Sequence, residues 1–234
     1  MVKMISSLLK LVLLLSLSVV ALGNANLNSG LRAYYLVQQW LGSYCNQAGT
    51  RCCYPPTGKP SPDFTIDGLW PYFNDGNFAY NCGIDNYDVA RIKPLQERLR
   101  VAWPSFTCPQ IGRKFWVHEW NKHGTCTKSN LGEIEYLETA MSLKKKMNLY
   151  QALIRAGITP NNNKFYSLKS IKKAIVKAIG FHPLIMCNHD AQGNSQIWQV
   201  SLCADTTGTK LIPCPYLPKG RGNCKAKIKF PSYY

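Results

Sequence analysis

The chain has 234 residues, of which 46% are hydrophobic, and its 28 Lys and Arg exceed its 12 Asp and Glu by a formal net charge of +16. It is long enough for a single domain with one sizeable core, and after residue 25 no apolar segment approaches the length of a membrane helix. The basic surplus favours polyanions such as RNA, acidic polysaccharide or anionic surfaces as partners. A well-solvated basic surface without a specific partner is the alternative.

Residues 1–25 are expected to form a secretory signal peptide. Lys3 and Lys10 flank a short charged start, and the apolar run LVLLLSLSVVALG that follows is too short to span a bilayer comfortably. We expect cleavage between Gly23 and Asn26, with an uncleaved anchor as the alternative. The mature chain, residues 26–234, is then a single domain in the secretory pathway that keeps 26 basic and 12 acidic residues, a net charge of +14.

Strands are predicted at both ends of the mature chain and helices in its middle. Residues 31–41 are rich in β-branched and aromatic side chains, which favour a strand, and a Pro-, Gly- and Cys-rich loop leads to a short strand at 63–66. Three helices are predicted from apolar periodicity, at residues 88–103, 133–157 and 167–180. Three further strands are predicted at residues 182–187, 195–204 and 225–230. This order favours an α+β fold with a central antiparallel sheet.

Local signals set the expected helix ends. Gly157 and Gly180 are typical helix stops, and Ser167 or Ser170 is the expected N-cap of the last helix. Pro94 is expected near the first turn of its helix, because proline lacks the N–H that an inner turn needs. The Lys-rich faces of the two long helices are interpreted as solvated surface.

The ten cysteines are interpreted as five disulfides. An even number spread through a secreted chain is typical of a disulfide framework. Zinc is disfavoured, because the only close pair is the adjacent Cys52 and Cys53, and no C-x-x-C pair occurs. The residues alone leave the connectivity open.

The segment FWVHEWNKHGTC, residues 115–126, carries the clearest chemical signal. If it is helical, His118 and Lys122 share one face, and Glu119 and His123 share the adjoining one. Such a group holds an anion and moves protons near neutral pH. A zinc helix opening with "HE" needs its second His where Lys122 stands, so we reject a metal. The interleaved aromatic residues argue against a helix whose polar side chains merely face water.

These features together resemble a known family. The segments FTIDGLWP and FWVHEWNKHGTC, about fifty residues apart, are similar to the two active-site segments of the RNase T2 family of secreted acid ribonucleases, as are LVQQW and CCYPPTGKP. With ten cysteines, the chain resembles the plant S-like branch most closely. The resemblance implies an α+β fold, single-stranded RNA as substrate and no cofactor. It also implies the disulfides Cys45–Cys52, Cys53–Cys108, Cys82–Cys126, Cys187–Cys224 and Cys203–Cys214.

The resemblance also implies roles for individual residues. In the family reaction a base removes the ribose 2′-hydroxyl proton, the oxygen attacks phosphorus, and an acid protonates the leaving 5′-oxygen to give a 2′,3′-cyclic phosphate. His123 matches the base and His118 the residue that positions phosphate. Glu119 and Lys122 match the groups that stabilise the pentacovalent phosphorane. Two further matches concern substrate binding: Trp70 corresponds to the wall of a base pocket, where stacking contributes roughly 1–3 kcal/mol, and Gln39 to a contact with a second base.

Asp67 stands where the family has its general-acid histidine. A carboxyl with a reference pKa near 3.9 is ionised at neutral pH, so it has no proton to donate and it repels phosphate. Asp67 could be protonated below about pH 4, but His123 would by then be protonated too. A protonated Asp67 and a neutral His123 would therefore exclude one another. A lesser departure is Tyr72, where the family usually has Asp or Asn.

From the signal peptide we predict a secreted protein, extracellular or vacuolar. From Asp67 we predict that it is catalytically inactive or severely impaired. Its expected function is storage or defence, with weak, salt-dependent binding of single-stranded RNA, and we expect a monomer that does not associate with membranes. The alternative is an active endoribonuclease that cleaves single-stranded RNA through a 2′,3′-cyclic phosphate.

Overall fold

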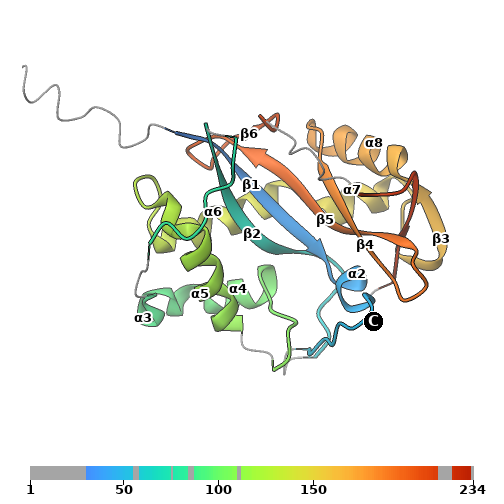
Figure 1. Cartoon of the computed structure of the whole chain (residues 1–234), viewed down its shortest axis with the longest axis horizontal. Helices are drawn as coiled ribbons and strands as arrows, with labels where there is room; N and C mark the ends of the chain where they lie inside the picture. The colour runs from blue at the N-terminus through green and yellow to red at the C-terminus, as the bar shows by residue number, and fades with distance from the viewer. Residues whose placement is uncertain are drawn as a thin grey trace, which may run out of the picture. The chain divides into compact units, whose positions relative to one another are not determined.

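A seven-stranded sheet organises the chain, with helices packed along it (Figure 1). This computed structural model describes residues 30–54, 58–74, 76–83, 87–109, 112–215 and 223–232. The predicted signal peptide, residues 1–25, lies outside the described residues. Among the helices that are described, none has the length and apolar content needed to cross a membrane.

The strands follow the order β2-β1-β5-β7-β3, and β4 and β6 also pair with β5. Their bounds are β1 Leu31–Trp40, β2 Phe64–Phe73, β3 Asn161–Ser167, β4 Leu184–His189, β5 Ser195–Ala204, β6 Leu211–Ile212 and β7 Lys227–Phe230. Every pairing is antiparallel apart from that of β5 with β7, which is parallel and rests on Gln196 opposite Lys229. The α+β fold is therefore confirmed, with a sheet that is mixed at this one pair.

The helical elements lie mostly in the middle of the chain. They are α2 Leu41–Cys45, α3 Val89–Ile92, the 3₁₀ turn η1 Lys93–Leu95, α4 Gln96–Ala102, α5 Gly112–Lys122, the 3₁₀ turn η2 Gly124–Thr127, α6 Glu133–Lys146, α7 Leu149–Arg155 and α8 Leu168–Ile179. Ser167, not Ser170, caps α8, and Gly180 ends that helix in the left-handed region with φ 93°.

Two predicted helices need correction, and one strand was not predicted. The helix predicted over 133–157 is two helices, because Met147 is fully buried between them and Asn148 caps α7 by accepting the Gln151 N–H. The helix predicted over 88–103 is divided at Pro94, which lies in η1. β3 was not predicted, because its asparagines have low strand propensity and only pairing with β7 orders them.

The hydrophobic cores on the two faces of the sheet differ in size. Alternate residues of β1, namely Tyr34, Leu36 and Trp40, enter the large core on the face that packs against the helices. Tyr35 points the other way, into a small aromatic cluster with Tyr72. Because α6 packs on β1 and β2, the edge of the sheet that carries β2 is held firmly in place.

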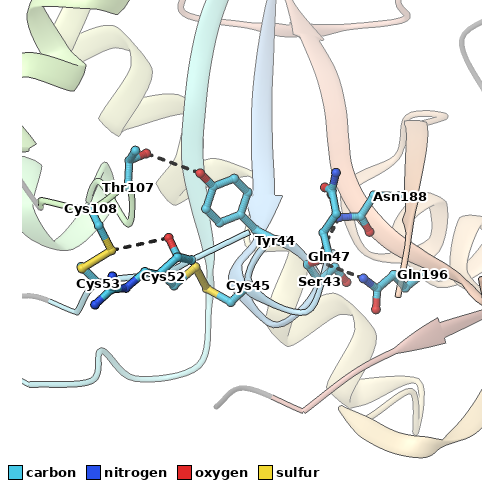
Figure 2. The surroundings of a disulfide bond; sticks show 11 residues. Ser43, Tyr44, Cys45, Gln47, Cys52, Cys53, Thr107, Cys108, Asn188 and Gln196 are labelled. Carbon is cyan, nitrogen blue, oxygen red and sulfur yellow. Dashed lines mark hydrogen bonds between the residues drawn. A yellow bond between two sulfur atoms is a disulfide. The ribbon is translucent and has the colours of Figure 1, made fainter. Parts of the chain in front are cut away.

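All five disulfides implied by the resemblance are present: Cys45–Cys52, Cys53–Cys108, Cys82–Cys126, Cys187–Cys224 and Cys203–Cys214. Figure 2 shows the first two of them: Cys45–Cys52 joins the end of α2 to the loop that follows, and Cys53–Cys108 joins that loop to the segment that contains Thr107, whose hydroxyl lies 3.4 Å from that of Tyr44. These crosslinks fix a long loop that has little secondary structure of its own.

Candidate active site

Asp67 is the unpaired residue of a β-bulge in β2. Gly68 lies opposite Val37 of β1 while Ile66 lies opposite Gln38, so Asp67 has no cross-strand partner. In a regular strand, residues 67 and 70 would point to opposite faces, since their separation is odd. The extra residue reverses that alternation and places Asp67 and Trp70 on the same face of the sheet, opposite the large core.

The Asp67 carboxylate is held by a residue that sequence reasoning missed. The Gln199 side chain on β5 donates its amide N–H to Asp67 Oδ2 at 2.7 Å, across the intervening strand β1. Burial raises the pKa of the Asp67 carboxyl to about 6, although this hydrogen bond and the charge of Lys122 act in the opposite direction. No local signal links positions 67 and 199, because their contact depends on how three strands pair.

A chain of indole hydrogen bonds connects β2 to α5. Trp103 donates its indole N–H to the Asp67 carbonyl at 3.2 Å, and Trp116 of α5 donates to the Trp103 carbonyl at 2.7 Å. Both indoles are buried. The helix that carries the other predicted site residues therefore positions the backbone of the bulge through Trp103.

Glu119 of α5 is buried and lies close to Gly68 and Trp70. Burial raises the pKa of Glu119 to about 8, the Asp67 charge raises it further, and the Lys122 charge and a hydrogen bond from Trp70 oppose this rise. A Cβ atom on residue 68 would overlap both the Trp70 indole nitrogen and Glu119 Oε2. Glycine is thus required at position 68 by the close approach of these two side chains.

His123 follows α5 directly, and its backbone N–H still bonds to the Glu119 carbonyl at 2.9 Å. Its Nδ1 lies 3.3 Å from the carbonyl oxygen of Ala79, which only accepts hydrogen bonds, so Nδ1 carries the proton and Nε2 keeps a free lone pair. Burial lowers the pKa of His123 to about 4, aided by the charges of Lys122 and His118. The ring is thus a neutral base over most of the pH range.

The segment that supplies this carbonyl is fixed on both sides. The Ala79 N–H bonds to the Pro71 carbonyl of β2 at 3.1 Å, and the Asn81 N–H bonds to the Lys122 carbonyl at 2.7 Å. The disulfide Cys82–Cys126 then joins the segment to η2. Residues 79–82 therefore connect the two halves of the site.

Trp70 and Gln39 occupy different positions relative to His123. The Trp70 ring stacks on the imidazole of His123, with centroids 5.3 Å apart and planes inclined by 26°, and Phe78 meets Trp70 edge-on. Gln39 is buried in the row across β2, β1 and β5, opposite Thr65 and Gln199. It is therefore a cross-strand neighbour of the residue that holds Asp67.

His118 and Lys122 complete the charged group. The His118 side chain is 61% exposed, and its Nε2 lies 3.9 Å from Glu119 Oε1. Burial, and then the charge of Lys122, lower the pKa of His118. Since the Lys122 charge also acts on Asp67, Glu119 and His123, one ammonium is the electrostatic centre of the whole group.

The prediction that a protonated Asp67 and a neutral His123 exclude one another is contradicted by the shifted pKa values of the two side chains. Asp67 is mostly protonated below about pH 6, and His123 is mostly neutral above about pH 4. Between these values a carboxylic acid and a free imidazole coexist, instead of excluding one another. Burial is the cause, because it disfavours the charged form of each group and so moves the two pKa values past one another.

Comparison with known proteins covers most of the chain. The profile described as the Ribonuclease T2 family matches residues 31–214. Ribonuclease 1 of Arabidopsis thaliana is 48% identical over 202 residues, 86% of this chain and 86% of that protein. The Ribonuclease-like storage protein of Panax ginseng is 30% identical over 205 residues, 87% of this chain and 84% of that protein. The crystal structure of RNase NT in complex with 5′-AMP is 48% identical, with a TM-score of 0.80, and the match covers 86% of this chain and 98% of that chain.

Proposed function

Because the chain belongs to the ribonuclease T2 family, we propose that it binds single-stranded RNA and is a severely impaired ribonuclease whose remaining activity is confined to mildly acidic pH. The observation that carries this proposal is the presence, on the general-acid side, of a half-buried carboxyl, Asp67, held by Gln199. The base side keeps every residue that the family reaction needs.

In the proposed reaction, Nε2 of His123 removes the proton of a ribose 2′-hydroxyl, and the freed oxygen forms a bond to the adjacent phosphorus. The bond from phosphorus to the 5′-oxygen breaks, and protonated Asp67 donates its proton to that leaving oxygen. The products are a 2′,3′-cyclic phosphate and a free 5′-hydroxyl, so the proton taken by His123 balances the one lost by Asp67. Lys122 and His118 hold the phosphate, Glu119 supports the phosphorane, and Trp70 stacks on a base.

Two deficits explain why this activity is severely impaired. Above about pH 6 Asp67 is a carboxylate with no proton to give, and the loss of general-acid catalysis costs about 10²–10⁴ in rate. A carboxylate also repels the substrate, by about 4 kcal/mol for like charges roughly 4 Å apart at an effective dielectric near 20. Below pH 6 the neutral acid ends the repulsion but still lacks the positive charge of an imidazolium.

A storage or defence role is the second candidate. It is favoured by the likeness to the ginseng protein named as a ribonuclease-like storage protein, and by five disulfides that suit long accumulation. We further propose that residues 1–25 direct the chain into the secretory pathway and that the mature protein, a monomer, is extracellular or vacuolar.

The test is RNA cleavage by the purified protein between about pH 3 and 8, beside Asp67→His and Asp67→Asn. We expect weak wild-type cleavage only between about pH 4 and 6, no such window in Asp67→Asn, and cleavage about 10²–10⁴ faster in Asp67→His at neutral pH. Wild-type activity equal to that of Asp67→His at neutral pH would show another proton donor. If the wild type is silent at every pH while Asp67→His cleaves RNA, the acidic window is wrong and the protein is a binding or storage protein.

A further inference from the structure

Almost all of the net charge belongs to one part of the chain. Residues 139–234 contain 15 of the 28 Lys and Arg but only 2 of the 12 Asp and Glu, namely Asp190 and Asp205. Residues 1–138 are close to balanced, with 13 basic and 10 acidic residues. The positive charge is therefore distributed unevenly along the chain, and its surplus falls in the segment that contains α8.

Neither of the two acidic residues is free to neutralise this region. Asp190 is 4% exposed and pairs with Lys229, whose Nζ lies 2.8 Å from Asp190 Oδ2. Asp205 accepts the backbone N–H groups of Thr209 and Lys210, at 3.0 and 3.1 Å, within its own turn. Asp190 therefore offsets Lys229 and Asp205 is bound within its own turn, so the remaining basic residues of the segment keep a large positive surplus.

The fold places α8, which carries four of these lysines, at the other edge of the sheet from the candidate active site. Asp67 and Trp70 lie on β2, which forms one edge of the strand order, whereas α8 packs against α7 and against β3 at the opposite edge. Figure 1 shows α8 beside α7 at one end of the sheet and α5 at the other. A ligand bound along α8 would not touch His123.

A groove of about 630 Å³ runs along α8. α8 turns Ile171, Ala174 and Ile175 into the core, so its lysines are left on the outer face. The groove has an apolar floor, formed by Leu168, Val176 and Ala226. Its lining also holds Lys169, Lys172, Lys173 and His182 and, among the described residues, no acidic side chain.

We propose that this groove is a second binding surface for single-stranded RNA, separate from the catalytic cleft. The lysine ammonium groups contact successive phosphates, while base and sugar faces lie against the apolar floor and the lysine stems. Lys169 and Lys173 of the groove and the exposed Lys177 beyond it follow one another by single helical turns, a rise of about 6 Å each, so they form a row along which an extended strand can run. A flat membrane would not fill a groove.

The choice of RNA as the occupant rests on the proposed function, but the test does not require cleavage. The probe is a fluorescent oligodeoxythymidylate of about 20 nucleotides, which has no 2′-hydroxyl and so is bound without being cut. Binding is measured by fluorescence anisotropy between about 50 and 200 mM salt. Three proteins are compared with the wild type: a quadruple Lys→Gln variant at 169, 172, 173 and 177, a charge-matched control, and Trp70→Ala in the cleft.

The charge-matched control changes four exposed basic residues of the N-terminal part to Gln, namely Arg32, Arg91, Lys93 and Lys114. We expect the α8 variant to lose at least about tenfold in affinity at 50 mM salt and to reduce the slope of log K against log salt by about 2 to 3, since each phosphate contact to a single strand contributes about 0.7. The control should lose much less, and Trp70→Ala should keep most of the binding.

Equal losses in the α8 variant and the control would overturn the proposal, because net charge alone would then explain binding. Loss confined to Trp70→Ala would also overturn it and would assign all binding to the catalytic cleft. If the α8 variant binds the oligonucleotide normally but loses a heparin fragment, the occupant is an acidic polysaccharide and RNA is wrong. Cleavage assays remain separate, so failure here leaves the proposed chemistry of Asp67 and His123 intact.

Discussion

The two segments that form the site, β2 and α5, differ in what positions their functional side chains. In α5 and the residue after it, His118, Glu119, Lys122 and His123 are placed by helical spacing, so their grouping is a local property. In β2 the key side chain, Asp67, is placed by a bulge and held by Gln199, which is 132 residues away. A helix therefore brings a group of side chains together through its own periodicity, whereas the position of a side chain on β2 depends on the strands that pair with it.

The largest expected effect tests the helical side. His123→Gln removes the neutral imidazole, and we expect the residual acidic cleavage to fall by about 10²–10⁴, or below detection. The same change in an Asp67→His background should lose as much, because the base is then the only group altered. RNA cleavage at about pH 5 measures both effects. Retention of activity in the double variant would remove His123 from the base role.

Gly68→Ala tests the contact between the two segments. The added Cβ would overlap Trp70 and Glu119, so we expect a loss of about 1–3 kcal/mol in the free energy of unfolding and weaker RNA binding. Gly83→Ala is the matched control, because a Cβ there meets no atom within 4 Å. Denaturant unfolding of both variants gives the difference. Equal stabilities would show that the site accommodates the methyl group.

Gln199→Leu tests the cross-strand support of Asp67. The Gln199 hydrogen bond lowers the pKa of Asp67, so its removal should raise that pKa and move the upper limb of the pH–rate profile to higher pH, by up to about one unit. Gln196→Leu is the control on the same strand, since Gln196 is buried but bonds to Ser43 instead. A limb that shifts equally in both variants would mean that Gln199 has only a structural role.

The smallest effect is on stability. The pKa of Asp67 is raised in the folded chain, so the native state binds more protons than the unfolded state, and Asp67 makes folding less favourable as pH rises through about 4 to 6. Asp67→Asn should therefore be more stable than the wild type above pH 6 and closer to it near pH 4. Unfolding curves at the two pH values measure this difference. If the difference in stability between wild type and Asp67→Asn were the same at both pH values, the pKa of Asp67 would be the same in the folded and unfolded chain.

His123 acts in the opposite sense on stability. Its folded pKa is lowered, so it contributes stability that is present above its unfolded pKa and is lost as pH falls towards about 4. Between those limits the two contributions to stability change in opposite directions with pH and largely cancel. This is the same range in which the proposed acid and base are both in their required states.

Much of this molecule was predictable from its sequence. The α+β class, the helix predicted over 167–180 and the strand over 195–204 follow from local patterns, and all five disulfides followed from the resemblance. The grouping of His118 with Glu119 and Lys122 needed only a helix. Local patterns determine such features because the residues involved are neighbours along the chain.

Only the tertiary structure decided the state of Asp67. The sequence shows which residue stands at position 67, and a reference pKa then makes it a carboxylate at every useful pH. Burial among β2, Gln199 and α5 raises that pKa, and burial beneath Trp70 lowers the pKa of His123. Desolvation depends on what packs around a group, and the packing comes from distant strands. The break at Met147 and the ordering of β3 have the same origin, because each depends on contacts far along the chain.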